Sequence, residues 1–113
     1  MSLFSSNRGF RWWLYTASHS QFRLRSPKHK EEQENVDIVF LSVFYIDLPT
    51  TLRGVVVDIA SNADIAMLTE KTGIAPDGYR NCFSLESGGK RYFVGAFSVR
   101  TSINTREYSD PGF

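Results

Sequence analysis

Few residues in this sequence have the types and spacing that chemistry needs. Ser87-Gly88-Gly89-Lys90 matches the S-x-x-K pattern of certain serine enzymes, in which the pattern opens a helix. Here it lies at the tip of a predicted β-hairpin, where both side chains reach into solvent. The segment also lacks the earlier glycine and the following Ser or Thr of a phosphate-binding P-loop. We therefore assign no catalytic residue, and the sequence leaves enzymatic activity undecided, with a non-enzymatic role favoured.

Ser42, Asp58 and Tyr45 form a second candidate group, for binding a small ligand. Ser42 and Asp58 are predicted neighbours on adjacent antiparallel strands, and Tyr45 lies close by in the sequence. If their face of the sheet lines a cleft, they are converging polar groups of the kind that orient a ligand. The simpler alternative is a structural Ser–Asp hydrogen bond at a sheet edge. Asp47 and Asp58 fall on opposite faces, which makes them poor partners for paired-carboxylate chemistry.

Cysteine and histidine are too sparse for a metal centre. Cys82 is the only cysteine, so no intramolecular disulfide can form, and a reducing compartment, the cytoplasm, is predicted. Its position beside Phe83 on a predicted strand indicates a buried, inert thiol. His19 and His29 cannot complete a Cys/His zinc site with one thiol on another segment. We expect no metal and no cofactor.

Length and composition predict one soluble domain spanning residues 1–113. The chain contains nine Phe, five Tyr and two Trp, enough aromatic side chains to dominate a core. No apolar run approaches the roughly 20 residues that cross a bilayer, so a membrane partner is not expected.

The net charge of +1 conceals an uneven distribution. Residues 1–30 contain six basic residues and no acidic ones, whereas residues 31–113 contain seven basic and twelve acidic residues. This basic N-terminal arm also contains Trp12, Trp13 and several other aromatic residues. Such interleaving suits single-stranded nucleic acid, where bases stack on rings and phosphates meet Lys or Arg. The alternative, which we favour, is an amphipathic hairpin with its rings in the core and its arginines in water.

Alternation predicts the elements of the core, residues 36–104. In the arm, 10–15 and 21–25 are predicted to pair as strands. The runs 36–47 and 53–60 are β-branched and aromatic, and Pro49 between them indicates a turn. Pairing them as a hairpin places Ser42 opposite Asp58 and gives one uniformly apolar face.

The rest of the chain predicts one helix and a second hairpin. Ser61 and Asp64 resemble a capping box that opens a helix, which ends near Thr72 before Gly73. Gly88-Gly89 is a strong two-residue turn between strands at 80–87 and 90–104, with Phe83 opposite Val94. Residues 105–113 are predicted to be a C-terminal tail.

The predicted fold is therefore α+β: a predominantly antiparallel sheet of about four to six strands with two hairpins, open to curling toward a half-barrel, and one short helix. A single short helix covers only one face of such a sheet. The apolar remainder exceeds what a monomer exposes. The N-terminal arm, a second copy of the chain or curling of the sheet into a half-barrel could each cover it, and a homodimer or higher oligomer is the cover that we favour. We expect its interface to include Phe40, Phe44, Ile46, Val56, Trp12 and Trp13.

The function predicted is that of a small non-enzymatic binding or accessory domain that acts through self-association and an apolar sheet face. A separate protein partner is compatible with it. One alternative is a ligand-binding or enzymatic domain with a pocket between sheet and helix. The other is nucleic-acid binding through the basic arm. The sequence identifies neither partner nor ligand.

Overall fold

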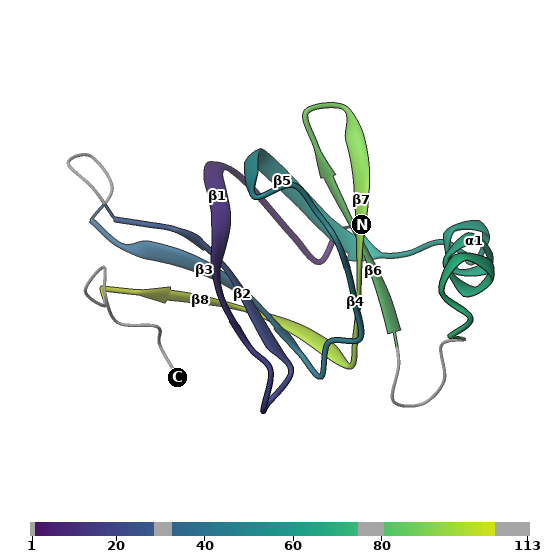
Figure 1. The fold of residues 1–113 in the computed structure, drawn as a ribbon. Coiled ribbons are helices and arrows are strands. Elements are labelled where there is room, and N and C mark those ends of the chain that lie inside the picture. Colours follow the sequence, from purple (N-terminus) through teal and green to yellow (C-terminus); the bar gives the residue numbers. More distant parts are fainter. Residues whose placement is uncertain (1, 29–32, 75–80, 106–113) are drawn as a thin grey trace.

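A computed structural model describes residues 2–28, 33–74 and 81–105 of the chain. It confirms the α+β class, with one antiparallel sheet and one short helix (Figure 1). In chain order the elements are β1 (Phe4–Thr16), β2 (Gln21–Ser26), β3 (Asn35–Leu41), β4 (Tyr45–Asp47), β5 (Thr51–Ile59), α1 (Asn62–Thr72), β6 (Asn81–Ser87), β7 (Lys90–Ala96) and β8 (Ser98–Asn104). The sheet order is β4-β7-β6-β5-β1-β2-β3-β8.

The eight strands exceed the predicted four to six because two expected strands are bent. The first run breaks after β3 at Ser42, whose φ of 54° no regular strand adopts. The second breaks between β7 and β8 at Phe97. At the bends Phe97 N donates to Leu41 O (2.8 Å), and Phe44 N donates to Gly95 O (2.9 Å). The pairs β3–β8 and β4–β7 are thus two parts of one bent ladder.

Two of the expected strand pairings are confirmed. β6 and β7 form a hairpin with Phe83 opposite Val94, as predicted. Its tip, Gly88-Gly89, has positive φ at both positions, the conformation that a two-residue turn requires. β1 and β2 also form a hairpin, with Tyr15 opposite Phe22.

The predicted pairing of residues 36–47 with 53–60 is wrong. β3 pairs with β2 and β8, and β5 pairs with β1 and β6. The hairpin β1–β2 therefore lies between the two runs in the sheet. Because the runs are apolar on both faces, alternation alone could not show which neighbour each one has.

The sheet curls around an apolar interior in which phenylalanine rings pack among aliphatic side chains. The rings of Phe40 on β3 and Phe83 on β6 lie 6.0 Å apart between centroids. These strands are four positions apart in the sheet, about 19 Å if it were flat, so the sheet must bend to bring them together. The N-terminal arm supplies Phe10, Phe22 and Leu24 to this core. The arm thus packs as a hairpin with rings in the core, as we favoured, but the expectation that its arginines lie in water is wrong for Arg23 and Arg25, which are buried.

Helix α1 covers a smaller second core on the outer side of the sheet. Its N-cap is Ser61, and the capping box with Asp64 is present as predicted. Gly73 ends it with a left-handed φ of 75°. Leu68 packs with Ala60, Cys82 and Phe93, and Tyr45 and Ile65 lie at the margin of this cluster. Within the described residues, no helix has the length and apolarity needed to cross a membrane.

Candidate functional site

The structure places the three predicted ligand-binding residues on separate elements. Ser42 is exposed at the bend between β3 and β4. Tyr45 begins β4 and packs near the second core. Asp58 lies on β5 opposite Ser84, and its Oδ1 accepts a hydrogen bond from the backbone of Ile59 (2.8 Å). The cross-strand pair of Ser42 and Asp58, on which that prediction rested, is not formed.

The six predicted interface residues do not make one exposed patch. Phe40 is 0 % exposed inside its own chain, so its predicted exposure is wrong. The reason is that the sheet curls and brings Phe83 of β6 to within 6.0 Å of Phe40, whose neighbour on β2, Phe22, stacks 6.1 Å away. Val56 and Trp12 each remain 39 % exposed. Half-buried positions are found for Phe44, Ile46 and Trp13.

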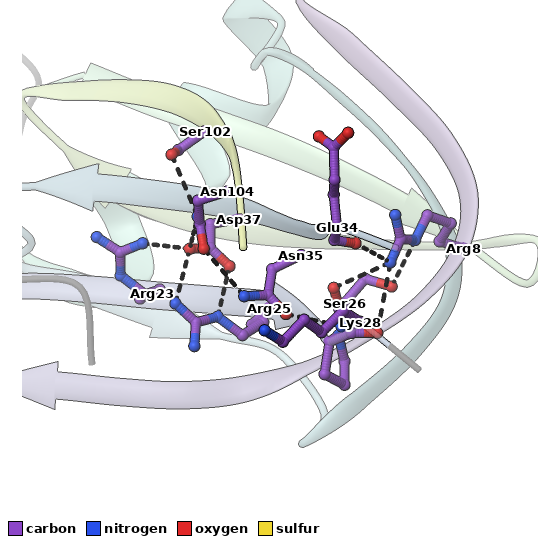
Figure 2. Close-up of polar contacts among 11 residues, drawn as sticks. Arg8, Arg23, Arg25, Ser26, Lys28, Glu34, Asn35, Asp37, Ser102 and Asn104 are labelled. Atoms are coloured by element: carbon purple, nitrogen blue, oxygen red, sulfur yellow. Dashed lines mark hydrogen bonds and ion pairs between the residues drawn. The ribbon is translucent and has the colours of Figure 1, made fainter. Parts of the chain in front are cut away.

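A buried polar network lies on the outer face of β2, β3 and β8 (Figure 2). Its centre is Asp37, which is 0 % exposed. Asp37 Oδ1 accepts from Arg25 Nε (2.7 Å), and Oδ2 accepts from Arg25 Nη2 and Asn104 Nδ2 (both 3.0 Å). Arg23, also buried, forms a second ion pair with Asp37. Charges this deeply buried require such partners.

Hydrogen bonds extend this network to the ends of β3 and β8. Asn35 Nδ2 donates to Asn104 Oδ1 (2.9 Å), and the backbone of Lys28 donates to Asn35 Oδ1 (2.7 Å). On the other side, the Arg25 guanidinium lies 5.1 Å from the centre of the Trp13 ring. The network therefore fastens β8 to β3 and β2 by side chains as well as by the backbone ladder.

The same contacts set the protonation of Asp37. Burial is the largest influence and by itself raises the pKa of this carboxyl group. Hydrogen bonds from Arg25 and Asn104, and the charges of Arg25 and Arg23, together outweigh burial and hold the pKa below its ordinary value of 3.8. Asp37 is therefore a structural anion with its lone pairs occupied, and a weak base.

Other reactive groups are placed quietly. Cys82 lies beneath α1, and burial raises the pKa of its thiol, which keeps it protonated at neutral pH. His19 is exposed in the β1–β2 turn, with Nδ1 3.1 Å from Ser18 Oγ. His29 lies outside the described residues. Among residues 2–28, 33–74 and 81–105, no three His, Cys, Asp or Glu side chains are grouped to hold a metal ion.

Sequence reasoning did not foresee that, within the described part of the chain, β8 is an edge of the sheet. This strand comes last in the sheet order, and β3 is its partner along all seven of its residues. Beside it lies a cavity of about 210 Å³, lined by Leu3, Phe4, Ile38, Val57, Val99, Arg100 and Thr101. Ile38 and Val57 are fully buried, whereas Leu3 is 51 % exposed at the opening. Ile103, on the same side of β8 as Val99 and Thr101 by alternation, is 67 % exposed.

Comparisons of the chain with protein-family models, curated proteins and solved structures found no match.

Proposed function

We propose that the protein is a small non-enzymatic binding domain that recognises an extended chain segment by adding it as a strand to β8. The carrying observation is that, among the residues that the structure describes, this seven-residue strand has a strand partner on one side only. An edge strand presents a row of backbone N–H and C=O groups that another extended chain can pair with. The contact surface is thus the edge at β8, in place of the apolar sheet face predicted from the sequence.

The two ends of the sheet differ in how well they are protected. β4 has only three residues, and Pro49 follows it closely. Short edges and proline discourage strand addition. β8 contains neither proline nor lysine, and Arg100 is its one charged residue. The polar network around Asp37 holds this longer edge in place through Asn104.

The cavity beside β8 can discriminate between peptides by the side chain that it accommodates. When a strand is added to an edge, backbone hydrogen bonds supply affinity and pockets for alternate side chains supply specificity. A volume of about 210 Å³ is comparable with the roughly 150 Å³ engineered cavity that admits benzene. Its lining, chiefly Leu3, Phe4, Val57 and Val99, favours one apolar side chain. The expected ligand is an extended peptide with such a residue opposite the cavity.

The two alternative functions receive less support. Neither this cavity nor a second one, at Ser6, Gly54 and Gly88, lies between sheet and helix. In the basic arm, Arg23 and Arg25 are buried against Asp37 and do not form an exposed basic stripe.

A selection from random displayed heptapeptides tests this function at protein concentrations where the chain is monomeric. Bound peptide should slow amide exchange along 98–104 and leave 45–47 unchanged. Thr101→Phe places a ring at the cavity and should weaken binding about tenfold, a cost of roughly 1.4 kcal/mol. Thr51→Phe, on an exposed position of β5, is the matched control. The proposal would be contradicted if bound peptides slowed amide exchange on another surface. It would also be contradicted if Thr51→Phe weakened peptide binding as much as Thr101→Phe.

A further inference from the structure

Building on the proposed function, we infer that the segment added to β8 is β8 of a second copy, antiparallel to the first about a two-fold axis at Thr101. This gives the predicted self-association a specific surface. When the two strands pair edge to edge about a two-fold axis perpendicular to the sheet, the same face of each strand lies on the same side of the joined sheet. Residues opposite one another must then both be odd-numbered or both even-numbered, because side chains alternate between the faces.

The sequence of β8 selects one of the allowed registers. An axis at Thr101 places Arg100 opposite Ser102, and Val99 opposite Ile103 of the second copy. An axis at Arg100 would instead place two arginines directly opposite each other, which is destabilising. The axis at Thr101 therefore combines an apolar pair with the absence of like charges.

This register also supplies an occupant for the cavity. Val99 lines the cavity, and its partner across the axis is Ile103 of the second copy. Ile103 is 67 % exposed in the single chain, so pairing would remove this apolar side chain from water. Symmetry repeats the contact, and each copy fills the cavity of the other. The net charge of +1 means that whole copies hardly repel each other.

Sedimentation velocity over a range of concentrations tests the association. We expect a monomer at low concentration and a dimer at high concentration. Thr101→Lys places two ammonium groups opposite each other at the axis and should raise the dimer dissociation constant about tenfold or more. Ala66→Lys adds the same charge at an exposed position of α1 and should leave the dimer unchanged.

Disulfide trapping tests the register, with Cys82→Ala as the background. Thr101→Cys brings two thiols together at the axis, and oxidation should yield a covalent dimer. Arg100→Cys lies one residue away and is also exposed, but it faces Ser102 of the other copy. Position 100 of the other copy then lies diagonally across the axis, and the two Cα atoms are farther apart than the roughly 7 Å limit for a disulfide.

The outcomes separate this inference from the proposed function. A monomer at every concentration overturns self-pairing, as does a dimer that Thr101→Lys leaves intact or one that Arg100→Cys traps equally well. Heptapeptides that still protect 98–104 would in that case preserve the binding function of the edge. If peptides map elsewhere while Thr101→Cys traps a dimer, the edge serves self-association alone.

Discussion

At the scale of single residues, Asp37 accounts for how a strand with charged outward positions becomes buried on both faces. Arg23 and Arg25 alternate with the core residues Phe22 and Leu24 along β2. Their guanidinium groups would ordinarily keep this face in water. Asp37, opposite Arg25 on β3, accepts hydrogen bonds from both arginines. Each arginine therefore has a carboxylate partner beneath the surface, and the two guanidinium groups share that single negative charge.

Asp37→Asn should cost the protein about 3 kcal/mol in the free energy of unfolding, because removing one partner of a buried ion pair leaves the other charge poorly compensated. Urea unfolding followed by tryptophan fluorescence measures this loss. Asp47→Asn, at an exposed position of β4, is the matched control and should change stability by less than about 0.5 kcal/mol. Equal midpoints for the two variants would show that the network contributes little.

The lowered pKa values of Asp37 and Asp64 predict acid sensitivity. Both lie below 3.8 in the folded protein, so on acidification the unfolded chain takes up protons first. Their contribution to stability is complete above the unfolded pKa and is lost as the pH falls through the folded pKa. We expect the free energy of unfolding to fall below about pH 4. In urea titrations at successive pH values, the free energy of unfolding of Asp37→Asn should decline less steeply on acidification than that of the natural protein. Parallel curves for the two proteins would refute the assignment of the decline to Asp37.

At the scale of elements, the two hairpins β1–β2 and β6–β7 were predicted correctly, and the pairing of residues 36–47 with 53–60 was not. Gly88-Gly89 specify a two-residue turn. A turn this short makes the two strands that flank it, β6 and β7, pair with each other. Pro49 gave no comparable constraint. The chain passes from β4 to β5 there, yet these strands lie three positions apart in the sheet. A turn residue shows where a strand ends and does not show which strand it will meet.

The candidate site was hidden from the sequence for the same reason. Whether β8 is an edge depends on the order of all eight strands. The bend at Phe97 that separates β8 from β7 is preceded by Gly95, but one glycine within a strand does not show that the strand ends there. Asp37 and its arginine partners lie more than ten positions apart along the chain, too far for a local charge pattern.

Helix α1 offers a prediction at this scale, because its capping box is intact. Ser61 Oγ accepts from Asp64 N (3.2 Å), and Asp64 Oδ2 accepts from Ser61 N (3.2 Å). Ser61→Ala removes the first bond and should cost about 1 kcal/mol. Ser61→Asn, which caps equally well, should retain nearly all of the stability. Thermal unfolding by circular dichroism compares them, and a loss of the same size in both would mean that the cap is not the cause.

At the scale of the whole molecule, one feature joins the two ends of the sheet. β3 continues into β4 through Ser42, and β7 continues into β8 through Phe97, so the two terminal strands belong to the same bent ladder. The interior that results takes residues from both halves, with Phe40 from one and Phe83 from the other. Neither half can bury its apolar side without the other. The chain should therefore unfold as one unit.

Phe40→Ala tests this cooperativity. Deleting a fully buried ring should destabilise the protein by about 3–5 kcal/mol, because the cavity left behind adds to the lost burial. Tryptophan fluorescence reports on β1, and far-ultraviolet circular dichroism reports on the backbone of the whole chain, including α1. Both transitions should coincide in the natural protein and move together in the variant.

Phe97→Ala is the matched control, because its ring is 47 % exposed at the bend between β7 and β8. Less of its surface leaves water on folding, so it should cost well under half as much as Phe40→Ala. If instead Phe40→Ala moved the fluorescence transition and left the circular dichroism transition in place, the two halves of the sheet would be separate folding units. The shared interior would then contribute much less to stability than the packing of Phe40 against Phe83 indicates.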